Sequence, residues 1–267
     1  MTYRPSAREI EQYRRDGYLM IHKPIFEIDD FERLKEYMIG KLDEATSPNG
    51  ARVQLVDCPH WRDAKIFEWL MAAEMLDLVE PLIGPDIGIF ACHLLQKPAG
   101  VGKRVPWHED SAYWQQVLKP MEVASVSIAL EPSVKANGCL RVIAGSHRNG
   151  YSDYEPVERP EEQVFPMEIK RSQYDESKAV DIEIQPNEAS IHHVRIIHGS
   201  NPNSGTQRRA VLTARYFPTH VKFDRESHPH FREHPFHIFL ARGRDKAGNR
   251  YSEPGKTSDV LHGVSTA

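Results

Sequence analysis

Two residues that can bind a metal ion stand two positions apart in the segment WHED at 107–110. In an extended strand the side chains of residues i and i+2 point to the same face, so His108 and Asp110 could aim at one ion. One short segment cannot surround a metal, and a third ligand must come from a distant part of the chain. The segment IHHVRIIHGS at 191–200 offers candidates, and the residues alone leave them open: His192, His193 and His198.

Two imidazoles and one carboxylate on one face of an octahedral ion leave three coordination positions free. This facial triad is the ligand set of non-haem iron(II) oxygenases, in which a co-substrate and dioxygen must both reach the metal. An HxD pattern is weak by itself, because it arises by chance in a chain with 14 histidines. The pattern therefore gains weight only from the elements and motifs that surround it.

Helical patterns come first along the chain. A helix is predicted over 6–15, where Ser6 and Glu9 have the spacing of a capping box, and others over about 29–42 and 64–83. After Gly84-Pro85 the pattern changes to short apolar or alternating runs separated by Gly, Pro and Asn. These runs predict strands over 18–21, 87–96, 123–130, 140–143, 180–184, 189–194 and 210–217.

Strands in this order and spacing favour an antiparallel jelly roll over alternating βαβ units. We expect one domain, 1–267, with a helical N-terminal part of about 1–85, a jelly-roll core of about 86–218 and a C-terminal extension of about 219–267. The charged insert at about 151–178 is too long for a hairpin loop, and we interpret it as a lid near the barrel opening.

Composition excludes several classes of function. The formal net charge of −4 gives no reason to expect nucleic acid or an anionic membrane as a partner. The cysteines, Cys58, Cys92 and Cys139, are scattered and form no CxxC pair, so they predict buried thiols instead of disulfides or a zinc site. Because the sequence shows neither a signal-peptide pattern nor an apolar membrane span, we expect a cytoplasmic protein.

Several motifs around the HxD segment agree in order and spacing with one known family. They are QKPAG at 96–100, WHEDSAYW at 107–114, NGCLRVIAGSH at 137–147, and HGS at 198–200 followed by Arg208-Arg209. Together they resemble the phytanoyl-CoA dioxygenase family over roughly residues 13–216. The resemblance implies a double-stranded β-helix, that is, a cupin-like jelly roll, which binds iron(II) and uses 2-oxoglutarate and dioxygen as co-substrates.

The resemblance also implies roles for individual residues. The metal ligands fall on His108, Asp110 and His198, which are also the catalytic residues. The arginine that holds the distal carboxylate of 2-oxoglutarate falls on Arg209, since a planar guanidinium can bind a carboxylate through two parallel hydrogen bonds. Arg208 is the neighbouring alternative. It would face the other side of a strand, and the family spacing favours Arg209.

Softer expectations concern the other contacts to 2-oxoglutarate. Ser200, Ser127 and Gln96 are the candidates, and each could equally be an ordinary strand hydroxyl or amide. Arg215 is interpreted as structural, and either of His192 and His193 as packing or contacting the substrate.

The chemistry implied is oxidative decarboxylation of 2-oxoglutarate to succinate and carbon dioxide, coupled to hydroxylation of a small-molecule substrate. Halogenases among the relatives have Gly or Ala in place of the carboxylate ligand, so the presence of Asp110 favours hydroxylation, desaturation or cyclisation. Two alternatives are a metal-dependent cupin-like isomerase or lyase and a non-catalytic jelly-roll binding protein. A buried Arg209 counts against both. Neither the substrate nor the oligomeric state follows from the sequence.

Overall fold

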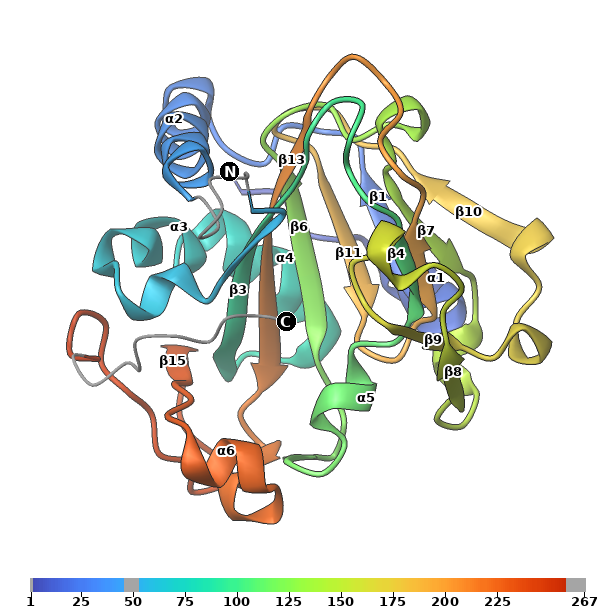
Figure 1. The fold of residues 1–267 in the computed structure, drawn as a ribbon. Helices are drawn as coiled ribbons and strands as arrows, with labels where there is room; N and C mark the ends of the chain where they lie inside the picture. The colour runs from blue at the N-terminus through green and yellow to red at the C-terminus, as the bar shows by residue number, and fades with distance from the viewer. Residues whose placement is uncertain (1, 46–52, 258–267) are drawn as a thin grey trace.

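The computed structural model describes residues 2–45 and 53–257. Figure 1 shows a large sheet at the centre, helices on its left and rear, and a smaller sheet on its right. The α-helices are α1 (Ala7–Asp16), α2 (Ile28–Glu44), α3 (Phe67–Leu70), α4 (Ala73–Ile83), α5 (Ser111–Trp114) and α6 (Pro229–Glu233). In the described ranges, no helix is both long enough and apolar enough to pass through a membrane.

The fold is an antiparallel jelly roll, as predicted. The large sheet has the order β1-β11-β6-β13-β3-β15, with β2 also pairing with β3, and the smaller sheet has the order β10-β7-β12-β4. The strands of the large sheet are β1 (Tyr18–Ile21), β2 (Leu55–Asp57), β3 (Ile87–Lys97), β6 (Ala124–Ala129), β11 (Ala189–His193), β13 (Arg209–Pro218) and β15 (Phe239–Arg242). Those of the smaller sheet are β4 (Val105–His108), β7 (Leu140–Ile143), β10 (Ala179–Ile182) and β12 (His198–Ser200).

Two short ribbons complete the strands. One pairs β5 (Leu118–Lys119) with β14 (Lys222–Phe223), and the other pairs β8 (Tyr154–Pro156) with β9 (Met167–Ile169). The second ribbon lies within the predicted insert, beside β4 (Figure 1). The insert therefore folds as a hairpin, with one 3-10 turn between its strands and two after the second strand.

All ten residues of β13 are buried, because both faces of this strand are covered. Alternate residues face the helices and join the main apolar core, and the intervening ones face a cavity between the two sheets. The core-facing set is Ala210, Leu212, Ala214 and Tyr216. The cavity-facing set is Arg209, Val211, Thr213 and Arg215.

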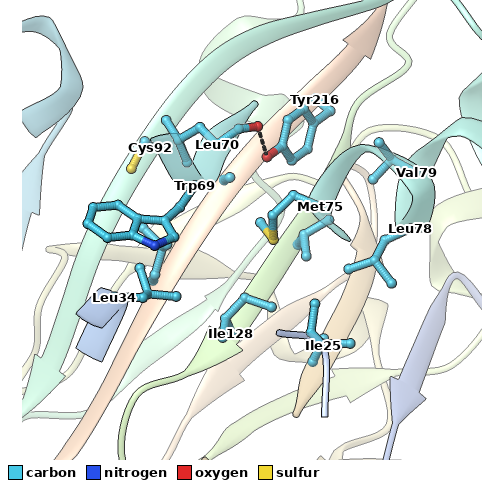
Figure 2. Packing of buried hydrophobic residues seen from close by; sticks show 14 of the residues in the cluster. Ile25, Leu34, Trp69, Leu70, Met75, Leu78, Val79, Cys92, Ile128 and Tyr216 are labelled. Atoms are coloured by element: carbon cyan, nitrogen blue, oxygen red, sulfur yellow. Dashed lines mark hydrogen bonds between the residues drawn. The ribbon is translucent and has the colours of Figure 1, made fainter. Parts of the chain in front are cut away.

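Helix α4 and the short helix α3 cover the outer face of the large sheet. Figure 2 shows their apolar side chains, among them Leu70 and Met75, packed against residues of the strands. The hydroxyl of Tyr216 donates a hydrogen bond of 2.8 Å to the backbone carbonyl of Leu70 in this layer. The helices thus hold one face of the central strands rigid while the other face is free to carry polar residues.

The N-terminal helices differ in detail from the prediction. In α1 the capping box of Ser6 and Glu9 is present, and Gly17 ends the helix with a φ of 82°. The N-cap of α2 is Glu27, and the helix runs from Ile28 to Glu44, two residues beyond the predicted end. The single helix expected over about 64–83 is a 3-10 turn followed by α3 and α4, because the chain leaves helical geometry at Ala72, which is extended.

The segment after β13, which forms the predicted C-terminal extension, contains regular elements. It contains β14 and α6, and β15 adds an edge strand to the large sheet by pairing with β3. Cys58, Cys92 and Cys139 are buried free thiols, which confirms that prediction.

Candidate active site

Three predicted ligands meet between the two sheets. His108 ends β4, Asp110 follows it at the start of α5, and His198 begins β12. Strands β4 and β12 pair with His108 opposite His198, so backbone hydrogen bonding sets the separation of the two rings. One possible ligand atom from each of the three residues lies within 4.8 Å of the others, and all three side chains are buried.

Strand alternation does not explain the position of Asp110. The strand ends at His108, and Asp110 has helical backbone angles, with φ −58° and ψ −32°. Its side chain still turns towards the same point as His108, because the chain bends into α5 immediately after the strand. The predicted proximity is present, but it arises from a strand-to-helix corner.

The two imidazoles are oriented by the same kind of hydrogen bond. In each ring Nδ1 faces the backbone carbonyl two residues earlier, at 2.8 Å from Pro106 for His108 and 2.9 Å from Ile196 for His198. A carbonyl can only accept, so Nδ1 carries the proton and Nε2 presents a lone pair. Burial lowers the pKa of both histidines, which keeps the rings neutral as a metal requires.

The carboxylate between them is held ionised. Burial by itself would raise the pKa of Asp110, but Arg215 and the neighbouring imidazoles outweigh this effect and hold the pKa well below its usual range. The guanidinium of Arg215 donates to one carboxylate oxygen from Nε at 3.0 Å and from Nη2 at 2.9 Å. The two neutral imidazole nitrogens and the anionic carboxylate oxygen face one shared position from the same side. This donor set fits iron(II).

Arg209 lies in the same cavity and is almost fully buried. One guanidinium nitrogen donates to the backbone carbonyl of Gly138, whereas its Nε has no hydrogen-bond partner among the described residues. Burial lowers the pKa of Arg209 to about 10, so the group is still a cation at neutral pH. Burying a cation with an unpaired N–H costs free energy unless an anion accepts its hydrogen bond. A carboxylate of 2-oxoglutarate would supply that anion.

The neighbouring Arg208 lies outside the cavity. Its guanidinium binds Glu131 through two hydrogen bonds of 2.8 and 2.9 Å and also contacts Asp43 at 2.7 Å. The two adjacent arginines therefore face opposite sides.

The three softer candidates differ from one another. Ser200 and Ser127 both line the cavity, and the hydroxyl of Ser127 lies 2.9 Å from that of Thr213. Gln96 also borders the cavity, but its amide nitrogen already donates to the backbone carbonyl of Val53 at 2.8 Å. Ser200 and Ser127 thus join Arg209 and the three ligands, whereas the amide nitrogen of Gln96 is bound to the segment before β2.

His192 and His193 alternate on β11. His192 lines the cavity, and its Nε2 lies 3.9 Å from the Asp110 carboxylate, yet neither ring nitrogen has a hydrogen-bond partner among the described residues. His193 faces the opposite way, next to Tyr13 and His147, and burial lowers its pKa to about 3.

The cavity has a volume of about 680 Å³, and its lining combines the polar residues described above with several aromatic rings. Beyond the three ligands, the wall comes from the insert and from the segment after β13. Phe165 of the insert packs its ring against that of His108, with centroids 5.3 Å apart. Phe231, Phe236 and His228, from the segment around α6, also line the cavity.

Two residues next to the ligands have contacts that the sequence did not predict. Arg215 faces the same side of β13 as Arg209, six residues earlier. Strand alternation could therefore have placed its side chain in the cavity. Glu109 is buried, and its two oxygens accept from the backbone of Ser152 at 2.7 Å and from the hydroxyl of Ser111 at 2.8 Å. It therefore fastens the insert to the metal-ligand corner, and no local pattern reveals this.

Comparison with known proteins gives results consistent with this geometry. The sequence model of the phytanoyl-CoA dioxygenase (PhyH) family matches residues 13–211, about three quarters of the chain. A probable alpha-ketoglutarate-dependent hypophosphite dioxygenase of Stutzerimonas stutzeri is 26% identical over 235 residues, which cover 79% of this chain and 78% of the relative. An ectoine dioxygenase of Sphingopyxis alaskensis is 25% identical over 268 residues, covering 92% and 85%.

Among solved structures, the apo form of the non-haem monooxygenase ThoJ superposes with a TM-score of 0.72. The match covers 94% of this chain and 90% of that one at 24% identity, so it bears on the fold alone.

Proposed function

The chain belongs to the phytanoyl-CoA dioxygenase family, and on that premise we propose that it hydroxylates a small molecule with iron(II) held by His108, Asp110 and His198. The protein is an iron(II)- and 2-oxoglutarate-dependent dioxygenase. When bound, the metal and the keto acid supply the oxidising chemistry, in which dioxygen converts 2-oxoglutarate to succinate and carbon dioxide while the substrate is oxidised.

One observation carries the assignment of residues. A neutral His–Asp–His donor set and a buried arginine with an unpaired Nε line a single cavity. An isomerase or a binding protein has no use for that buried cation, whereas a dicarboxylate co-substrate needs it. In this proposal Arg209 binds the distal carboxylate and Ser200 and Ser127 contact the co-substrate, whereas Gln96, whose amide nitrogen already donates to Val53, only borders the cavity.

The substrate occupies the opposite end of the cavity. A volume of about 680 Å³ exceeds what a five-carbon diacid fills, and it lies within the usual range for small-molecule pockets. The aromatic rings of Phe165, Phe231 and Phe236 favour a substrate with an apolar surface and keep water away from the ligands. Both named relatives are dioxygenases of small molecules, which supports a small molecule as the substrate. The buried free thiols support a cytoplasmic location.

The test is reconstitution with iron(II) under controlled oxygen. We expect succinate formation that requires both 2-oxoglutarate and dioxygen, and a panel of metabolites should reveal the substrate by increasing it. Asp110→Ala should abolish the reaction, and Arg208→Ala should leave it intact. Metal binding without succinate would favour an isomerase or lyase, and absence of metal binding would favour a non-catalytic protein.

A further inference from the structure

The two oxygens of Asp110 have different neighbours. Oδ1 lies 3.9 Å from Nε2 of His108 and 3.9 Å from Nε2 of His198, so it faces the space where a metal would sit. Oδ2 instead accepts both hydrogen bonds from Arg215. The carboxylate is therefore divided, with one oxygen directed at the metal position and the other engaged by a cation.

Arg215 is itself held in place on three sides. It is almost fully buried, and its guanidinium carbon lies 5.2 Å from the centre of the Trp114 ring. Its Nη1 donates to Nδ1 of His93 on the neighbouring strand β3. A guanidinium constrained by a ring, a carboxylate and an imidazole has little freedom to rotate.

The chain of contacts continues outward from His93. Because Nδ1 accepts from Arg215, the proton of the neutral imidazole is on Nε2, which lies 2.8 Å from Oδ1 of Asp57. Asp57 and His93 are cross-strand partners on β2 and β3. Strand register thus lines up a continuous path from Asp57 through His93 and Arg215 to Asp110.

A second metal site is the obvious alternative for part of this path. Donor atoms of Asp57, Cys58 and His93 lie within 4.8 Å of one another. However, Nε2 of His93 carries the proton that Asp57 accepts, so it offers no lone pair to a metal. Burial also raises the pKa of the Cys58 thiol well above its usual range, which disfavours a thiolate ligand. The contacts match a hydrogen-bonded anchor better.

We propose that Asp57, His93 and Arg215 form a positioning relay that keeps Asp110 a one-oxygen ligand. The proposal rests on the proposed function, in which Asp110 binds iron(II). If both oxygens of Asp110 bound the metal, the protein would fill four positions of an octahedral ion and leave only two. A keto acid that chelates through two atoms, together with dioxygen, needs three. The relay therefore preserves the open position on which the reaction depends.

The experiment compares matched variants by binding, independently of turnover. The probes are Mn²⁺ binding to the metal-free protein and 2-oxoglutarate binding to the Mn²⁺-loaded protein. His93→Leu breaks the relay, whereas His93→Asn retains its link to Arg215, because the amide oxygen can take the place of Nδ1 and accept the hydrogen bond. Arg215→Met removes the central cation, and Arg208→Met is the control arginine outside the cavity.

We expect Arg215→Met and His93→Leu to weaken binding of one or both probes by about 10- to 100-fold, the usual scale for groups that orient metal ligands. His93→Asn and Arg208→Met should resemble the wild type. The relay is wrong if His93→Leu binds both probes like the wild type, or if His93→Asn is as weak as His93→Leu.

The His93 pair decides the question even if Arg215→Met does not fold, because thermal unfolding can show that both His93 variants are folded. Asp110→Ala separates the two levels of the argument. If it keeps wild-type Mn²⁺ affinity, the proposed metal site itself fails. If it loses Mn²⁺ while both His93 variants and Arg215→Met bind normally, only the relay fails.

Discussion

The two ends of the cavity are built in different ways. At the end proposed for 2-oxoglutarate, Arg209 and Ser127 project from β13 and β6, central strands whose other face is locked against helices. At the far end, Phe165 comes from the loop that joins β8 and β9 within the insert. Phe231 and Phe236 come from the segment after β14. Strand register fixes the first end, the strand-built end, and the packing of loops fixes the second, the loop-built end. The reaction is thus assigned to the regular part of the fold and substrate recognition to the irregular part.

The largest expected effect is at the strand-built end. Arg209→Ala should raise the dissociation constant for 2-oxoglutarate about a hundredfold, since two charge-assisted hydrogen bonds together contribute about 3 kcal/mol. Substrate binding should change far less. Calorimetric titration of the Mn²⁺-loaded protein measures the effect, with Arg208→Ala as the control. Equal losses in both variants would mean that overall charge matters and the cavity position does not.

A second test concerns the anchoring of the loop-built end. His60 is buried against Phe67 and Phe239 of β15, and burial, reinforced by His93 and opposed by Asp57, lowers its pKa to about 3. Because the unfolded chain binds a proton near pH 6.5 and the folded chain does not, the stability that neutral His60 contributes is lost as the pH falls from about 6.5 towards 3.

This loss should amount to about 2 kcal/mol at pH 5. Denaturant unfolding at pH 7 and pH 5 should therefore show a smaller acid loss for His60→Phe than for the wild type. His220→Phe, at an exposed histidine, should behave like the wild type. An unchanged acid loss in His60→Phe would show that this histidine does not couple pH to the packing of β15.

Phe165→Ala should affect only the loop-built end. Loss of the ring that packs on His108 should raise the KM for the substrate about tenfold, as expected when a hydrophobic pocket loses part of its wall. The KM for 2-oxoglutarate should stay the same. Tyr174→Ala is a suitable control, because Tyr174 belongs to the insert but packs outside the cavity against Trp107. A change in the KM for 2-oxoglutarate alone would break the division between the two ends.

The smallest expected effect is that of Ser127→Ala. One hydrogen bond to the co-substrate and one to Thr213 would be lost, with a net cost of about 1 kcal/mol, or about fivefold in 2-oxoglutarate affinity. Ser125→Ala is the comparison on the same face, because Ser125 lies two residues earlier on β6, opposite Arg215, and does not line the cavity. Identical affinities for the two variants would place Ser127 in a purely structural role.

Local patterns predicted much of the strand-built end. The alternation of β13 puts Arg208 and Arg209 on opposite faces, and the family resemblance selected Arg209; elsewhere, the capping box and Gly17 delimit α1. These features depend on neighbouring residues, which the sequence displays directly. The same alternation puts Arg215 on the cavity face, but the sequence predicted only a structural role for it, because its contact with Asp110 depends on a partner 105 residues away.

The loop-built end could not be predicted in this way. Pairing of β15 with β3 joins segments about 150 residues apart, and Glu109 acts through the backbone of Ser152 in the insert. The strand-to-helix corner at Asp110 likewise follows from packing around α5. Such contacts arise from tertiary structure that overrides local preference, so periodicity carries no sign of them.

The segment between β14 and β15 has a consequence for how this protein could acquire new specificities. One of its ends pairs with β5 in a two-stranded ribbon and the other pairs with β3 of the large sheet, and Phe231 and Phe236 lie between these two points. The sequence of this segment can therefore change while its two paired ends stay in place, as antibody loops vary on a constant framework. Evolution or an engineer could retarget the oxidation by rewriting this stretch while leaving every strand that carries the reaction untouched.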